Sequence, residues 1–79
     1  MTNLEKYTEV FAESLNISKE ETAGLVYQGI DEWDSVGHMS LISALEDAFD
    51  IMFDTDDIID LSSFEKGKEI LKKYDVEFN

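Results

Sequence analysis

Apolar residues recur at helical spacing in three separate segments of this 79-residue chain, residues 3–15, 35–50 and 62–74. The chain has no proline, its four glycines are scattered, and no stretch has the composition of a linker or an internal repeat. A chain of this length folds as one domain, because a second hydrophobic core would bury too little surface to be stable. The sequence therefore predicts a single all-α domain over residues 1–79, a small bundle of three main helices and one short helix.

The same spacing assigns the helix starts and the inward faces. Thr2 and Glu5 are spaced as a capping box before the first helix, and Ser62 and Glu65 are spaced likewise before the last. The residues expected in the core from these two helices are Leu4, Tyr7, Phe11, Leu15, Phe64, Leu71 and Tyr74. The acidic stretch "DTDDIIDL" forms a short turn that offers the core three more residues, Ile58, Ile59 and Leu61.

Between the first two helices, residues 16–33 break the helical pattern. The sequence "SKEE" is spaced like the start of a short helical turn, and we expect Leu25, Val26 and Ile30 to be buried beneath this segment. We interpret the segment as a long, partly ordered loop. Loops of this length are unusual in a small domain and are typical of functional segments.

Residues 35–50 give the clearest helix, and its two faces differ sharply. At about 100° per residue, the core side carries Leu41, Ile42, Leu45, Ala48 and Phe49, with His38 near the same side. The opposite side carries Val36, Met39, Ser40, Ser43, Glu46, Asp47 and Asp50. Two apolar residues, Val36 and Met39, are therefore expected among acids on the outer face.

Charge and cysteine content restrict the function. Nineteen acidic against six basic residues give a formal charge of −13, which repels nucleic acid and anionic membrane surfaces and favours proteins with basic patches. There is no cysteine for a disulfide, a thiolate zinc site or thiol chemistry. The first residues lack the pattern of a signal peptide, and no apolar run approaches a membrane span. We expect a cytoplasmic monomer.

The stretch "EWDSVGHM" raises the question of what Ser35 does. Asp34 is a good N-cap, because its carboxylate can accept from free backbone N–H groups and complements the helix dipole. A capping role alone would explain both Asp34 and Ser35, but it leaves the outward Val36 and Met39 unexplained. A serine at a helix N-terminus is also well placed to carry a phosphate ester, since the backbone N–H groups there favour an anion.

A hydrolase is disfavoured by the same stretch. A nucleophile elbow needs a glycine two residues before the serine and a strand before that. Here the residue two positions before Ser35 is Trp33, and no strand is expected. His38 follows one helical turn later, but it points towards the core, and no third group is placed to orient it. We interpret His38 as a partly buried packing residue.

Calcium binding of the EF-hand type is also disfavoured. Residues 54–65 have the required twelve-residue length, with aspartates at the first and third positions and a glutamate at the last. An EF-hand loop needs an oxygen ligand at its fifth position and glycine at its sixth, and here these are Ile58 and Ile59. No metal site is predicted.

The stretch "DSVGHMSLISALEDAFDI" resembles the D-S-[LV] motif and following helix of acyl carrier proteins, and the resemblance in helix order, size and acidity extends over nearly the whole chain. It implies a carrier that is not an enzyme. Ser35 would receive 4′-phosphopantetheine from coenzyme A through a phosphopantetheinyl transferase, and the thiol of this arm would hold cargo as a thioester. Asp34 matches the motif acid. The positions that match partner contacts of the family are Val36, Met39, Glu46, Asp47 and Asp50.

Two positions depart from many fatty-acid carriers, which have acids where this chain has Gly37 and Ser40. The resemblance is therefore closer to carriers of specialised routes, such as polyketide, aminoacyl or surface-polysaccharide assembly. Their partners would be acyl or aminoacyl ligases, synthases or transferases with basic patches. The alternative is a small acidic protein-interaction module that uses the same face without modification.

Overall fold

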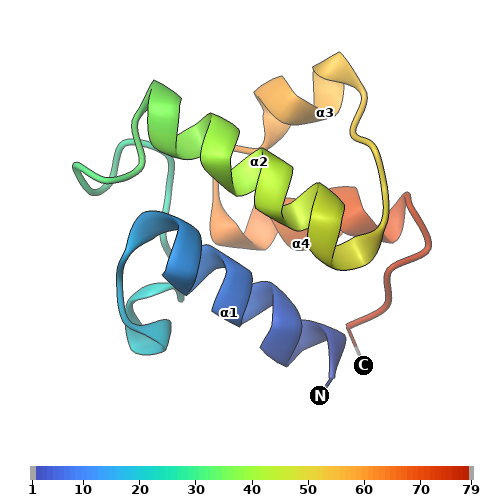
Figure 1. The fold of residues 1–79 in the computed structure, drawn as a ribbon, viewed down its shortest axis with the longest axis horizontal. Coiled ribbons are helices and arrows are strands. Elements are labelled where there is room, and N and C mark those ends of the chain that lie inside the picture. Colours follow the sequence, from blue (N-terminus) through green and yellow to red (C-terminus); the bar gives the residue numbers. More distant parts are fainter. Residues whose placement is uncertain (1, 79) are drawn as a thin grey trace.

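The computed structural model describes residues 2–78 and contains four α-helices (Figure 1). They are α1 (Asn3–Leu15), α2 (Ser35–Phe49), α3 (Thr55–Asp60) and α4 (Phe64–Lys72). A single 3-10 turn, η1 (Lys19–Glu21), interrupts the long connection between α1 and α2. No β-strand occurs in the described residues, so the predicted all-α domain with three main helices and one short helix is confirmed. None of these helices combines the length and apolar character that crossing a bilayer requires.

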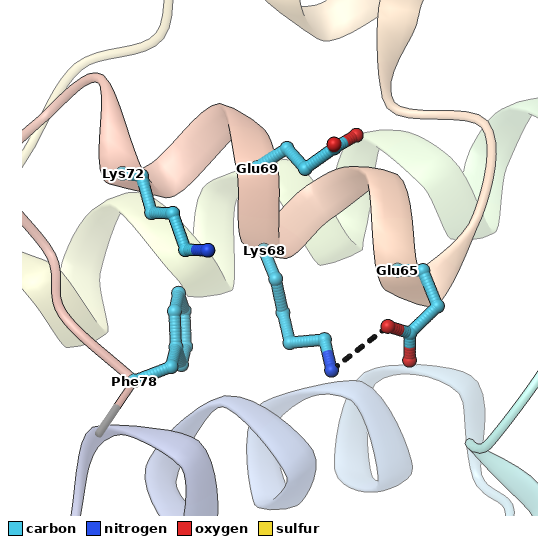
Figure 2. Close-up of a pocket in the computed structure, with 5 residues that line it drawn as sticks. All are labelled: Glu65, Lys68, Glu69, Lys72 and Phe78. Carbon is cyan, nitrogen blue, oxygen red and sulfur yellow. Dashed lines mark ion pairs between the residues drawn. The ribbon is translucent and has the colours of Figure 1, made fainter.

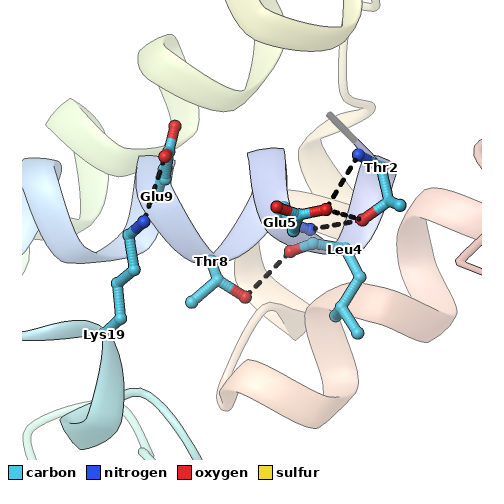
Figure 3. A network of polar contacts seen from close by, with 6 residues as sticks. All are labelled: Thr2, Leu4, Glu5, Thr8, Glu9 and Lys19. Carbon is cyan, nitrogen blue, oxygen red and sulfur yellow. Dashed lines mark hydrogen bonds and ion pairs between the residues drawn. The ribbon is translucent and has the colours of Figure 1, made fainter.

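The start of α1 is fixed by the predicted capping box, which Figure 3 shows. The backbone N–H of Glu5 donates to the Thr2 hydroxyl at 3.1 Å, and the Thr2 N–H donates to the Glu5 carboxylate at 3.3 Å. The helix ends at Asn16, which adopts the left-handed conformation of a C-cap. Lys19 then pairs with Glu9 at 3.0 Å and ties η1 back to α1.

Aromatic rings form the centre of the core. The ring of Phe11 lies edge-on to Trp33 and Phe64, with centroid distances of 5.3 and 5.0 Å. Tyr7 packs on Phe64 at 4.7 Å. Phe11 and Trp33 are fully buried, although Trp33 belongs to the end of the long connection and not to a helix. The connection is therefore anchored to α1 just before α2 begins.

Three residues expected in the core are exposed instead: Leu4 is 40% exposed, Val26 51% and Ile59 73%. For Val26 the cause is a short antiparallel contact with the residues before α4, in which the Tyr27 N–H donates to the Ser62 carbonyl at 2.8 Å. Neighbouring side chains alternate in such a segment, so Leu25 points inward and Val26 outward. In α3, a helix of six residues, the inward positions go to Ile58 and Asp57.

The predicted capping box of α4 is wrong by one residue. The N-cap is Ser63, whose hydroxyl accepts from the Lys66 N–H at 2.9 Å. Ser62 is held by the contact with Tyr27 and lies one residue before the cap. The predicted inward residues of α4 are confirmed, because Phe64 and Leu71 are buried and Tyr74 is half-buried. The helix ends at Lys72, two residues before the end of the predicted segment.

Helix α4 approaches α1 closely at Gly67. The Tyr7 hydroxyl donates to the Phe64 carbonyl at 2.6 Å, and burial raises the pKa of Tyr7 well above its usual range. A Cβ atom at position 67 would overlap the Tyr7 hydroxyl and lie 2.7 Å from a methyl group of Leu61. Only glycine allows this approach.

We therefore predict that Gly67→Ala lowers the free energy of unfolding by about 1–3 kcal/mol through overpacking. Helix propensity alone predicts the opposite, a gain of about 1 kcal/mol. Urea unfolding followed by circular dichroism measures the difference. Tyr7→Phe removes the overlapping oxygen. It should therefore lower the free energy of unfolding less when it is added to Gly67→Ala than when it is made in the wild type. A Gly67→Ala protein more stable than the wild type would contradict the close approach.

A polar cluster joins α3 to the end of α4. Asp57 is only 5% exposed, and its carboxylate accepts from Lys73 and from the Tyr74 hydroxyl, the latter at 2.6 Å. The hydrogen bond from Lys73, followed by that from Tyr74, lowers the pKa of Asp57. Tyr74 in turn accepts from the Asp54 N–H at 2.9 Å, so the cluster also holds the residue before α3.

We predict that Asp57→Asn lowers the free energy of unfolding by about 1 kcal/mol near neutral pH. Because folding depresses the pKa of Asp57, the ionised carboxylate contributes fully above its unfolded value of about 4 and loses this contribution as the pH falls through the folded value. Unfolding curves of wild type and variant should thus converge in acid. The exposed acid Asp47, changed to Asn, is the control. If the difference in free energy of unfolding between wild type and Asp57→Asn does not shrink in acid, the stabilising role of the ionised Asp57 carboxylate is contradicted.

Candidate functional site

Ser35 is the first residue of α2, and its hydroxyl is not used to cap the helix. Asp34 is the N-cap, as predicted: its carboxylate accepts from the Gly37 N–H at 2.9 Å, and its carbonyl accepts from the His38 N–H at 2.8 Å. Ser35 is exposed. Its hydroxyl lies 3.5 Å from that of Tyr27, the one side-chain hydrogen-bond contact it makes within residues 2–78. The N-cap therefore fixes the backbone at Ser35, while the side chain of Ser35 is exposed.

The rigid setting of Ser35 comes from Trp33 and His38. The Trp33 indole N–H donates to His38 Nδ1 at 3.0 Å. Since Nδ1 accepts, the proton of the neutral ring is on Nε2, which donates to the Ile58 carbonyl at 2.8 Å. His38 is half-buried, in agreement with the prediction of a packing residue. Both ring nitrogens are occupied, so His38 has no nitrogen available to take a proton from Ser35.

Tyr27 completes this cluster from the middle of the long connection. Its ring lies edge-on to His38 and Trp33, with centroid distances of 5.3 and 6.0 Å. Sequence reasoning did not assign Tyr27 or Trp33 to the site. The signal for Trp33 was its place directly before Asp34, where a buried ring fixes the approach to the helix. Nothing in the local pattern points to Tyr27, which reaches the site only through the fold.

The outer face of α2 carries Val36 and Met39, and both are exposed as predicted. Val36 is 75% exposed and Met39 is 55% exposed. They line a shallow hollow of about 740 Å³, whose lining residues are Ser35, Val36, Met39, Ser40, Ser43, Ala44 and Asp47. An exposed apolar strip beside an exposed serine is a surface on which a protein partner can pack.

The three predicted acidic contacts are not equivalent. Asp47 is exposed on the same face, and Asp50 is the exposed C-cap of α2 in a left-handed conformation. Glu46 is half-buried, and its carboxylate accepts from the Phe53 N–H at 2.9 Å. Glu46 thus has a structural role in fixing the segment between α2 and α3, which the helical wheel did not indicate.

Two other hollows differ in character. One of about 250 Å³ lies between α2 and α3 and is lined by Tyr27, His38, Ile58, Ile59, Leu61 and Ser62. The other, of about 470 Å³, lies at α4 and the C-terminal segment, where Lys68 pairs with Glu65 at 3.0 Å (Figure 2). Carboxylates there offset the ammonium groups, and none of the described residues that line it carries a nucleophilic hydroxyl or an imidazole. Over residues 2–78, no group of three or more histidine and carboxylate side chains is arranged to hold a metal ion.

Comparisons of this chain with protein-family models, with curated proteins and with solved structures found no match. The chemistry of Ser35 and its surroundings is therefore the basis for a functional proposal.

The two faces of α2 give a direct prediction for stability. Leu45 is fully buried, so Leu45→Ala should lower the free energy of unfolding by about 2–5 kcal/mol. Met39→Ala on the outer face should lower it by less than about 0.5 kcal/mol. Thermal and urea unfolding of both variants measure the contrast. Comparable losses would mean that Met39 belongs to the core.

Proposed function

We propose that this protein is a carrier of the acyl-carrier type, with Ser35 as the attachment site for 4′-phosphopantetheine. The observation that carries the proposal is the combination of a solvent-facing hydroxyl, a backbone fixed by Asp34 and Trp33, and an exposed apolar strip beside it. The order of helices, with a long connection before α2 and a short α3, supports an acyl-carrier-like bundle.

The surroundings of Ser35 fit a covalently attached phosphate ester. The residue lies at the N-terminal end of a fifteen-residue helix, where the dipole favours an anion, and its side chain is exposed. The hollow along α2 begins at Ser35, which leaves space for an arm that leaves the protein there. Asp34 remains occupied with the Gly37 N–H and keeps the helix start in place.

Attachment is a phosphoryl transfer in which the chain supplies the nucleophile. The Ser35 oxygen attacks the phosphorus that bears pantetheine in coenzyme A, an Oγ–P bond forms, and the P–O bond to the departing adenosine 3′,5′-bisphosphate breaks. The hydroxyl proton passes to a base of the transferase, because both nitrogens of His38 are engaged. The chain has no cysteine and therefore no thiol of its own. Once bound, the arm supplies a thiol that holds cargo as a thioester.

The partners of such a carrier are proteins. They are a phosphopantetheinyl transferase and then the acyl or aminoacyl ligases, synthases or transferases of a lipid, polyketide or polysaccharide route. The formal charge of −13 favours enzymes with basic patches and disfavours nucleic acid and membranes. The carrier itself performs no catalysis, and we place it in the cytoplasm as a monomer.

The second candidate is an acidic interaction module that binds a basic partner without modification. The exposure of Val36 and Met39 favours it as much as it favours the carrier. The two functions differ in one respect, namely whether the Ser35 hydroxyl reacts.

We predict that incubation with coenzyme A, Mg²⁺ and a broad-specificity transferase adds one phosphopantetheinyl group to the wild-type chain, as measured by intact mass. Ser35→Ala should abolish the addition and change the free energy of unfolding by less than about 1 kcal/mol, because Asp34 still caps the helix. Ser43→Ala, which changes another exposed serine of the same hollow, is the matched control and should react normally.

Three outcomes bear on the proposal. Addition to the wild type and to Ser43→Ala, but not to Ser35→Ala, supports the carrier. Addition to Ser35→Ala would contradict the site. A wild-type chain that stays unmodified with every transferase tested would favour the interaction module.

A further inference from the structure

Near Ser35 in the sequence, the acidic residues belong to the loop before α2 and not to the helix itself. No acidic residue occurs in α2 before Glu46. The acids nearest in sequence to Ser35 are Asp31, Glu32 and Asp34, and Asp34 is engaged as the cap. Asp31 and Glu32 are exposed, and none of the three ion pairs among residues 2–78 involves them. Their charges are available to a partner.

Gly37 allows this loop to lie against the start of the helix. A Cβ atom at position 37 would overlap the carbonyl oxygen of Glu32 and lie 3.2 Å from its carbonyl carbon. Backbone hydrogen bonds hold the same turn from the other side, because the Trp33 N–H donates to the Ile30 carbonyl at 3.2 Å. Figure 1 shows the loop passing directly beyond the N-terminal end of α2. Because position 37 has no side chain, the turn can pack against the first turn of α2.

The outer surface of α2 consequently has three parts in a row. The Asp31–Glu32 turn lies at the N-terminal end, exposed Val36 and Met39 follow, and Asp47 with Asp50 lies at the far end. From the first residue of α2 to its C-cap the helix rises about 22 Å. A partner that covers this surface meets negative charge at both ends and an apolar strip between them.

We infer that a phosphopantetheinyl transferase recognises the Asp31–Glu32 turn, which Gly37 allows to pack against α2, as one edge of its docking surface. The inference rests on the proposed function and identifies the determinant of this partner. Coenzyme A carries a diphosphate and a 3′-phosphate, so an enzyme that presents it to Ser35 has cationic groups around its active site. Acids next to Ser35 complement that charge, and Val36 and Met39 give the same enzyme an apolar contact.

The test measures the kinetics with which the transferase modifies the full chain, by intact mass at several carrier and salt concentrations. The variant Asp31→Lys/Glu32→Lys reverses both charges of the turn. We expect the KM for the carrier to rise about tenfold or more with little change in kcat, and the dependence of kcat/KM on salt to weaken. The matched control, Glu69→Lys/Glu77→Lys, makes the same change of net charge at two exposed positions on α4 and after it. It should shift KM by less than about twofold.

Gly37→Ala tests the placement of the turn without changing any charge. It should also raise KM, and its melting curve shows whether the variant is folded. The inference is overturned if the wild-type chain is modified normally and the KM of Asp31→Lys/Glu32→Lys equals that of the Glu69→Lys/Glu77→Lys control. That result leaves the proposed function intact. A wild-type chain that is never modified overturns both.

Discussion

The burial of Trp33 is the interaction on which the rest of the site depends. Its ring is fully buried against Phe11 of α1, while its indole N–H is satisfied by His38 of α2. Truncating a buried ring of this size typically costs about 3–5 kcal/mol, so the end of the long connection is fixed strongly. Because Trp33 directly precedes Asp34, this anchor sets the position of the N-cap and therefore of Ser35. A short, rigid link thus joins the core to an exposed hydroxyl.

His38 extends the same anchor to α3. Its Nε2 donates to the Ile58 carbonyl, so one imidazole ring connects the loop, α2 and α3 around Ser35. The cluster at Asp57 then fixes the other side of α3 to the end of α4. The short helix α3, which has little buried surface of its own, is therefore held largely by polar contacts from its neighbours. These contacts keep the surroundings of Ser35 in one arrangement.

Most of the negative charge is left at the surface. Three ion pairs among residues 2–78 use only three of the nineteen acids in the chain. Mutual repulsion among the remaining acids opposes folding, and the aromatic core has to offset it. A surface of this charge favours fast association with a cationic partner and disfavours an anionic one. The outer face of α2 and the Asp31–Glu32 turn place part of that charge on either side of the apolar strip.

Helix periodicity and caps predicted much of this structure, because both are local properties of the sequence. The bounds of α1, the start of α2 and the cap at Asp34 were predicted from residue spacing and cap chemistry, whereas α2 ends one residue before the predicted bound. The N-cap of α4 and the exposure of Val26 could not be predicted, because both depend on backbone pairing between distant segments.

At the site, the exposure of Val36 and Met39 followed from the helical wheel. The role of Gly37 did not, since it depends on where the loop carbonyl of Glu32 comes to lie. The contacts of Tyr27 with His38 and Ser35 likewise arise only when the long connection folds back over α2.

Modification of Ser35 is tested most directly by peptide-mapping mass spectrometry of the protein isolated from the cells that make it. We expect phosphopantetheine on the peptide that contains Ser35, attached through that hydroxyl. A native protein that carries no modification on Ser35, or carries the group on another serine, would contradict it.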